Sequence, residues 1–271
     1  MQLRAAALLL LLAGLGAWSF LHAQKPFREY DTVEGHAESV VPEDANIPHE
    51  WTRARLMYRE SPVYGRRFFG GNGSWTIDYP RSDRHLLYGV KRLTLIDARS
   101  VEQAVALDGS DDIFNWPMLY AVEVGHWDLD ETEAAQLREY INRGGFLMVD
   151  DFHGTREWDI FVEGMNKVFP DREIVDLPNN DPIFHVLYDL DDKYQIPGAQ
   201  YLQSGRTYEQ DGYTAKWRGI FDDKGRIVVA ICHNMDLGDA WEWSDEPAYP
   251  AEWANMAYRI GMNYFVYDLT H

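Results

Sequence analysis

The strongest constraint on the fold is a stretch in the middle of the chain that combines a helix end, a buried strand and polar residues. It reads Arg143-Gly-Gly-Phe-Leu-Met-Val-Asp-Asp-Phe-His-Gly154, and Gly144 is typical of the residue that ends a helix. The apolar run that follows predicts a buried strand. This strand leads directly into Asp150, Asp151 and His153, and open α/β sheets usually place their binding sites at this end of a strand.

The rest of the chain alternates between apolar runs of strand length and helical patterns. Strands are expected over residues 54–58, 105–107, 118–122, 146–149, 174–175 and 227–231, and helices over 83–93, 131–143, 156–169 and 253–264. Asp130 and Glu133 form a capping box, and Ser82 and Thr155 are expected as further helix caps. This alternation predicts an α/β protein, a three-layer sandwich in which helices cover both faces of a mainly parallel sheet.

Length and charge limit the domain count and the partners. The chain has 271 residues, of which 46% are hydrophobic, and one main domain over residues 51–271 is expected. With 44 acidic and 25 basic residues, the formal net charge is −19. Such a charge repels phosphate backbones and anionic membrane surfaces, so nucleic acid is not an expected partner.

The N-terminal sequence predicts export. Arg4 precedes an apolar run at 5–15, and this pattern is typical of a signal peptide over residues 1–23, with an uncleaved membrane anchor as the alternative. Residues 24–50 lack periodicity and are expected to form an extended leader. The protein is therefore expected to be periplasmic, or attached to the outer face of the cytoplasmic membrane through its N-terminal segment alone.

Three polar segments interrupt the predicted core, at residues 79–85, 150–153 and 233–243. In a parallel sheet the last two leave the carboxyl ends of strands and meet in one crevice, while the first adds to its rim. The candidate catalytic residues are Asp150, Asp151 and His153, and the candidate ligand-binding residues are Arg81, Asp83, Arg84, His233, Asn234, Asp236, Asp239 and Trp241.

The two neighbouring aspartates suit acid–base chemistry or metal binding. Asp150 or Asp151 can act as a general base or a carboxylate nucleophile, but adjacent strand residues point to opposite faces unless the backbone turns. The other aspartate is then free to cap the helix near Thr155. His153 can relay a proton, bind a metal or hydrogen-bond the loop. Carboxylates and imidazoles also suit a divalent metal, although no metal-binding spacing pattern is present.

The remaining candidates each allow a structural alternative. Trp241 and Trp243 beside acidic residues are typical of sugar binding, but they also suit a cover for the core. Arg81 and Arg84 can bind an anionic ligand or pair with nearby acidic residues. Cys232 is the only cysteine, so an intramolecular disulfide is impossible, and a small buried residue is the expected role.

Four separated segments resemble the family of domain of unknown function 4159 (DUF4159). They are Tyr79-Pro-Arg-Ser-Asp-Arg, Gly144-Gly-Phe-Leu-Met-Val-Asp-Asp-Phe, Asp181-Pro-Ile-Phe-His and His233-Asn-Met-Asp-Leu-Gly-Asp-Ala-Trp-Glu-Trp. The resemblance covers most of residues 51–271. It implies a flavodoxin-like fold similar to the class I glutamine amidotransferases, in an exported or membrane-associated bacterial protein. Those enzymes carry a nucleophilic Cys after a strand, where this chain has Asp150 to Gly154, so glutaminase activity is not expected.

Three classes of function remain. The leading interpretation is a noncatalytic binding or scaffold domain whose polar crevice holds a small ligand or a protein of the cell envelope. The alternative is a hydrolase that uses an Asp base, with or without a divalent metal, on an envelope substrate. The third is a structural component of a membrane-associated assembly. The sequence contains no recognised catalytic triad.

Overall fold

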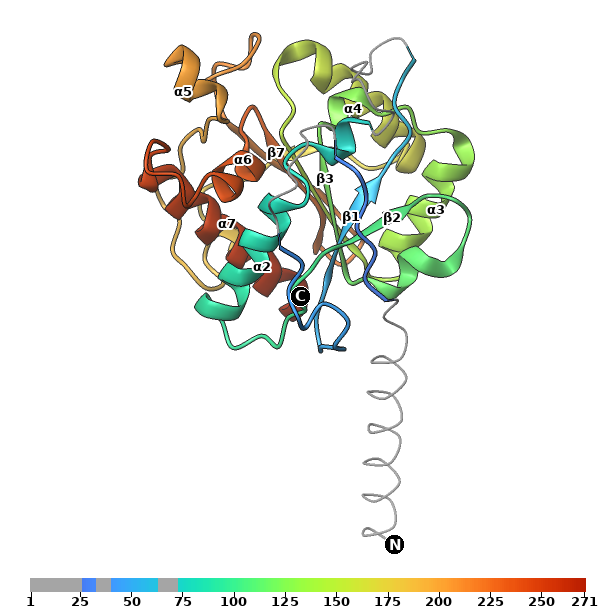
Figure 1. Cartoon of the computed structure of the whole chain (residues 1–271). Helices are drawn as coiled ribbons and strands as arrows, with labels where there is room; N and C mark the ends of the chain where they lie inside the picture. Colours follow the sequence, from blue (N-terminus) through green and yellow to red (C-terminus); the bar gives the residue numbers. More distant parts are fainter. Residues whose placement is uncertain (1–25, 33–39, 63–72) are drawn as a thin grey trace, which may run out of the picture.

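A computed structural model describes residues 26–32, 40–62 and 73–271 (Figure 1). The predicted signal peptide or anchor at 1–23 and parts of the predicted leader lie outside these ranges. Within them, no helix has both the length and the apolar character that crossing a membrane requires.

The described strands form one mixed sheet in the order β2-β1-β3-β4-β7-β6-β5. The first five strands in this order are parallel to their neighbours, whereas β6 is antiparallel to β7 and β5 to β6. The bounds are β1 Arg53–Met57, β2 Gln103–Ala106, β3 Met118–Val122, β4 Phe146–Asp150, β5 Val175–Asp176, β6 Lys216–Phe221 and β7 Ile227–His233. The predicted α/β class with a mainly parallel sheet is therefore confirmed.

Helices cover both faces of this sheet (Figure 1). On one side lie α2, α6 and α7, which contact one another, and on the other lie α3 and α4. The bounds are α2 Arg81–Leu93, α3 Glu131–Asn142, α4 Gly154–Val168, α5 Gln200–Ser204, α6 Leu237–Glu242 and α7 Ala251–Thr270. Short 3-10 helices occupy η1 Ser74–Thr76, η2 Asp111–Asn115, η3 Val124–His126 and η4 Pro182–Phe184.

Each face of the sheet has its own apolar core. In β4, Phe146 and Met148 belong to the core beneath α2, α6 and α7, while Leu147 and Val149 belong to the core beneath α3 and α4. This division follows from the alternation of side chains along a strand. By the same alternation, Asp150 at the end of β4 points toward the α2, α6 and α7 side.

Helix capping follows the sequence prediction at one helix and departs from it at two. At α3 the Asp130 side chain accepts hydrogen bonds from the backbone N–H groups of Thr132 and Glu133, and the Glu133 carboxylate accepts one from the Asp130 N–H, which confirms the capping box. The predicted caps Ser82 and Thr155 are wrong, because α2 and α4 already begin at the residue before each of them.

The described part of the leader packs against the domain. Within residues 26–32, the backbone N–H of Tyr30 donates to the Tyr79 hydroxyl at 3.2 Å. The Glu29 carboxylate accepts a hydrogen bond from Arg84 Nη2 at 2.5 Å. These contacts hold this segment beside α2 instead of letting it extend away from the domain as a spacer.

The second glycine of the helix-to-strand turn is required by packing. A Cβ at Gly145 would lie 2.3–2.6 Å from ring atoms of Tyr140. That ring cannot move aside easily, because its hydroxyl donates to the carbonyls of Pro117 at 2.8 Å and Phe146 at 3.3 Å. We expect Gly145→Ala to lower the free energy of unfolding by about 1–3 kcal/mol through overpacking, measured by urea denaturation. An unchanged unfolding midpoint would contradict this packing argument.

Candidate functional site

The backbone turns sharply where three neighbouring strands end. Glu123 follows β3, Asp151 follows β4 and Asn234 follows β7, and their φ angles are 50°, 52° and 64°. Asp78, in the segment before α2, has a φ of 59°. Residues other than glycine rarely adopt this left-handed conformation, and such residues cluster at functional sites. The turn at Asp151 means that strand alternation no longer separates its side chain from that of Asp150.

Asp150 is a buried carboxylate that lies at the N-terminus of α6, whose N-cap residue is Asp236. Its Oδ2 atom accepts hydrogen bonds from the Tyr120 hydroxyl at 3.1 Å and from the backbone N–H groups of Leu237 and Gly238 at 2.8 and 3.0 Å. The second oxygen, Oδ1, is buried and makes no hydrogen bond with any described residue. Burial, and then the nearby carboxylate of Asp151, raises the pKa of Asp150 to about 8. Asp150 thus contacts the first N–H groups of α6 and not the helix near Thr155 that was predicted for one of the two aspartates.

Three further carboxylates meet at this edge of the sheet. Asp78, Asp151 and Asp236 each offer an oxygen, and these oxygens all lie within 4.8 Å of one another. All three residues are buried, with exposed fractions of 1%, 5% and 3%. They come from three separate segments, before α2, after β4 and after β7. We call these three residues the carboxylate cluster.

The surroundings of the carboxylate cluster are strongly acidic. Asp78 also belongs to a second group of oxygens, with Asp239 and Glu242. Burial, followed by the charges of Asp151, Asp239, Asp78 and Asp150, raises the pKa of Asp236 well above its ordinary value. Among the described residues, no Lys or Arg forms an ion pair with Asp151 or Asp236. The cluster therefore concentrates acidic groups in a buried place, with the His153 ring beside Asp151.

The backbone of two glycines lies close to the cluster. A Cβ at Gly238 would lie 2.2 Å from Asp78 Oδ2, and a Cβ at Gly198 would lie 2.4 Å from Asp236 Oδ2. Asp236 is held by a hydrogen bond that its Oδ1 accepts from the Asp239 N–H at 2.7 Å. A side chain at either glycine would therefore displace a carboxylate.

His153 lies beside the cluster. Its Nε2 atom is 3.2 Å from Asp151 Oδ1 and 3.9 Å from Glu209 Oε1. Burial lowers the pKa of His153, but the hydrogen bond to Asp151 and the surrounding carboxylates outweigh it and raise the pKa to about 9. The ring is therefore a cation near neutral pH and cannot accept a proton as a general base.

A second buried histidine joins the loop after β3 to α4. His126 Nδ1 lies 2.9 Å from Glu123 Oε2, and its Nε2 lies 3.7 Å from Glu157 Oε1. Oxygen and nitrogen atoms of these three residues lie within 4.8 Å of one another. Because each ring nitrogen faces a carboxylate, this group already has a structural role as an ion-pair network. No pattern in the sequence indicates this group.

The residues predicted at the rim of the crevice form other contacts. Asp83 is fully buried and forms ion pairs with Arg53 and Arg55, two residues of β1 that face α2. Arg84 Nη2 lies 2.5 Å from Glu29 Oε2 in the leader, and Arg81 Nη2 lies 2.6 Å from Asp245 Oδ1. The structure therefore supports the expectation that these two arginines pair with nearby acidic residues.

Three other predicted ligand-binding residues have structural contacts, namely His233, Asn234 and Trp241. His233 stacks on Phe152 with ring centroids 4.8 Å apart, and burial lowers its pKa to about 4, so the ring is neutral. The Asn234 side chain accepts a hydrogen bond from the Gly154 N–H at 2.8 Å. Trp241 is completely buried, and it covers the core instead of presenting a face to a sugar. Of the predicted site residues, the structure thus brings together Asp150, Asp151, His153, Asp236 and Asp239.

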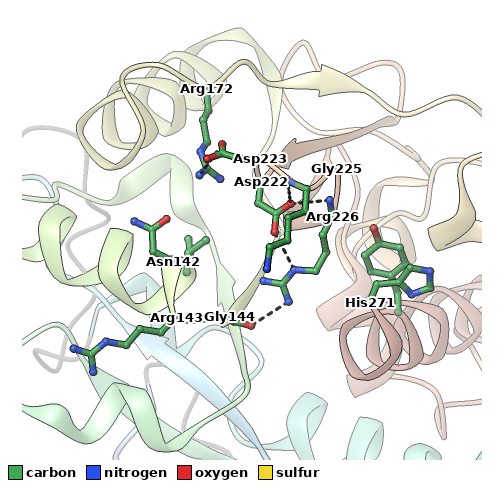
Figure 2. Close-up of a pocket in the computed structure, with 12 residues that line it drawn as sticks. Asn142, Arg143, Gly144, Arg172, Asp222, Asp223, Gly225, Arg226 and His271 are labelled. Atoms are coloured by element: carbon green, nitrogen blue, oxygen red, sulfur yellow. Dashed lines mark hydrogen bonds and ion pairs between the residues drawn. The ribbon is translucent and has the colours of Figure 1, made fainter.

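A cavity of about 760 Å³ lies at the opposite edge of the sheet, near the start of β4 and β7 (Figure 2). Its arginines hold loops together. Arg226 Nη1 donates to the Gly144 carbonyl at 3.1 Å, and Arg172 Nη1 donates to the Phe221 carbonyl at 3.1 Å. Asp222 accepts hydrogen bonds within its own turn. Since these polar groups already have structural partners, the carboxylate cluster is the better candidate site.

The fold and the cluster together define an α/β domain with a buried acidic site at the carboxyl edge of its parallel strands. The chain belongs to the DUF4159 family, described as a domain of unknown function, which it matches over residues 54–269. No curated protein matches the chain. The predicted family is confirmed, and the family description names no activity.

Proposed function

We propose that this domain is a binding module whose ligand places a positive charge at the carboxylate cluster. The convergence of three buried carboxylates, Asp78, Asp151 and Asp236, carries the proposal. Buried charges are normally paired or coordinate metals, and like charges at this distance destabilise one another. Asp236 forms no ion pair with a Lys, Arg or His of the described residues, so a cationic ligand beside it would supply a compensating charge.

We further propose a flavodoxin-like arrangement, similar to that of the class I glutamine amidotransferases. The order β2-β1-β3-β4-β7 of the parallel strands supports this arrangement, in which ligands bind beyond the carboxyl ends of the strands. The cysteine chemistry of those enzymes is not part of the proposal. Cys232 is fully buried, and burial raises the pKa of its thiol well above the ordinary value, which opposes nucleophilic attack.

The place of action is also a proposal. The N-terminal sequence supports export to the periplasm or attachment to the outer face of the cytoplasmic membrane. In that compartment the ligand would be a small cationic molecule, an ion or a positively charged segment of an envelope protein. The scaffold role expected from the sequence is compatible with the last of these ligands.

A hydrolase is the second candidate, and the contact between His153 and Asp151 favours it. With a pKa of about 9, His153 would act as a general acid, and a carboxylate of the cluster would have to activate water. This candidate predicts turnover of an ester or amide substrate that is lost in Asp151→Asn. Substrate binding without turnover would favour the binding module.

The first test removes one charge from the cluster. We expect Asp236→Asn to raise the free energy of unfolding of the metal-free protein at pH 8 by at least about 1 kcal/mol, because repulsion among buried carboxylates is relieved. Asparagine keeps the oxygen that caps α6, so the helix should be unaffected. Urea denaturation in the presence of a chelator measures the change.

The control is Asp171→Asn, which makes the same chemical change at an exposed position in the loop after α4. It should leave the free energy of unfolding within about 0.5 kcal/mol of wild type. Because the pKa of Asp236 is raised in the folded state, the gain from Asp236→Asn should shrink as the pH falls toward 4. A loss of stability in Asp236→Asn at pH 8 would mean that this carboxylate is a structural group, and the proposal would fail.

A further inference from the structure

We infer that an apolar patch, at the edge of the domain opposite the carboxylate cluster, rests on the lipid surface of the membrane that holds the N-terminal segment. This inference rests on the proposed place of action, in the form in which the N-terminal segment stays attached as an anchor. The patch consists of five exposed large apolar side chains, which are Val40, Val41, Ile47, Leu93 and Leu95.

Two chain segments carry the patch, and both precede strands of the parallel part of the sheet. Residues 40–50 lead into β1, and residues 93–102, which begin at the end of α2, lead into β2. Both segments therefore lie at the amino ends of the parallel strands, at the lower edge of the domain in Figure 1. Asp151 and Asp236 follow the carboxyl ends of β4 and β7, so the carboxylate cluster lies at the opposite edge.

Polar contacts between the two segments hold the patch together. Lys91 Nζ, in the last turn of α2, donates to Asp44 Oδ2 at 3.0 Å. Arg99 Nε donates to the carbonyl of Ala45, also at 3.0 Å. Between these contacts, Leu95 is completely exposed. Apolar side chains that gather at one edge of a domain mark a surface that contacts a protein or a membrane.

The N-terminal segment reaches the domain beside this patch. The backbone N–H of Phe27 donates to Asn46 Oδ1 at 2.9 Å, and Asn46 directly precedes Ile47. The anchor expected from the sequence ends at residue 23, four residues before Phe27. Whatever their conformation, four residues reach at most about 14 Å. An anchored chain therefore holds this edge of the domain close to the lipid, and this position identifies the lipid surface as the occupant of the patch.

The charge of the protein indicates how the contact is made. A net charge of −19 repels anionic lipids at long range, so the attraction comes from apolar contact and from the high local concentration that the anchor provides. Lys91 and Arg92 are exposed and lie just before Leu93, which is typical of a segment at the level of the lipid headgroups. In this orientation the carboxylate cluster faces away from the membrane.

The test uses the full chain in phospholipid vesicles, with a fluorescent label on one introduced cysteine. Cys232 is fully buried, so a thiol reagent labels the introduced cysteine alone. The label is placed at Leu95→Cys or, as the control, at Tyr213→Cys, an exposed position just before β6 at the carboxylate edge. Lipids with a nitroxide near the headgroup should quench the label at position 95 at least about twofold more strongly, because interfacial apolar groups lie about 5–10 Å deep.

A second pair of variants tests whether the apolar side chains make the contact. With the label at Ile47→Cys, adding Leu95→Glu should reduce the quenching at least about twofold, because a carboxylate opposes insertion among lipids. Adding Tyr213→Glu instead should leave the quenching unchanged. Both substitutions replace exposed side chains, so the fold should tolerate them.

Three results would overturn the inference. Equal quenching at positions 95 and 213 would show that the patch does not touch lipid. A label at position 95 that nitroxide lipids do not quench, but that is shielded from iodide in the water, would place a second copy of the chain on the patch. A chain that begins near residue 24 when isolated from its cells and weighed by mass spectrometry would lack the anchor. None of these results changes the stability of Asp236→Asn, so this inference and the binding module fail separately.

Discussion

Asp83→Asn is expected to lower the free energy of unfolding by about 3–5 kcal/mol, since it leaves two buried guanidinium groups without a counter-charge. Asp83, Arg53 and Arg55 each have side chains that are 0% exposed. Asp83 Oδ2 accepts a hydrogen bond from Arg55 Nε at 2.8 Å, and Oδ1 accepts one from Arg53 Nη2. This network joins α2 to β1 below the carboxyl ends of the parallel strands. Its loss should therefore weaken the packing of the whole α2 helix.

The matched control for this prediction lies next to the same helix. Asp245 pairs with Arg81 at 2.6 Å, but its side chain is 59% exposed. Asp245→Asn should therefore cost less than about 1 kcal/mol. Equilibrium denaturation in urea compares the two variants at one pH. Equal and small losses would show that the buried network contributes no more than a surface ion pair.

Glu102→Gln is expected to raise the free energy of unfolding by roughly 3 kcal/mol at pH 8, since one pKa unit corresponds to about 1.4 kcal/mol. Glu102 is 0% exposed, and neither carboxylate oxygen makes a hydrogen bond with a described residue. Burial, and then the charge of Asp83, raises its pKa from 4.5 to about 7, although Arg84 opposes this. Above that pH the folded protein carries a buried charge that glutamine removes.

The raised pKa of Glu102 also predicts how the stability of the protein changes with pH. The pKa of Glu102 is higher in the folded protein than in the unfolded chain, so the folded state binds more protons between pH 4.5 and about 7. Stability should therefore fall across this range in wild type, and this part of the fall should be missing in Glu102→Gln. Thermal melts from pH 4 to pH 9 measure both. Parallel curves for the two proteins would contradict the prediction.

Much of the fold could be predicted because local patterns and tertiary structure agree in the centre of the chain. The predicted strand at 118–122 coincides with β3, and the capping box at Asp130 begins α3. One strand, β6, and two α-helices, α5 and α6, were missed for physical reasons. β6 mixes Lys216, Arg218 and Gly219 into its sequence, so it lacks the alternation of a typical strand. α5 and α6 have only five and six residues, too few for a helical period to emerge.

The site could be predicted only in part, because tertiary contacts decide which polar residues meet. Asp150, Asp151 and Asp236 were identified because they follow predicted strands. Asp78 lies one residue before a segment that was identified, and only the structure shows that its carboxylate reaches the end of β4. Asp83 was expected at a ligand site, but its partners are arginines of β1, whose inward direction no local pattern indicates.

The most direct test of the proposed binding module compares the urea unfolding of wild type and Asp236→Asn at pH 8 in the presence of a chelator. We predict that Asp236→Asn is more stable than wild type by at least about 1 kcal/mol, while Asp171→Asn stays within about 0.5 kcal/mol of wild type. An Asp236→Asn protein that is less stable than wild type would contradict the account.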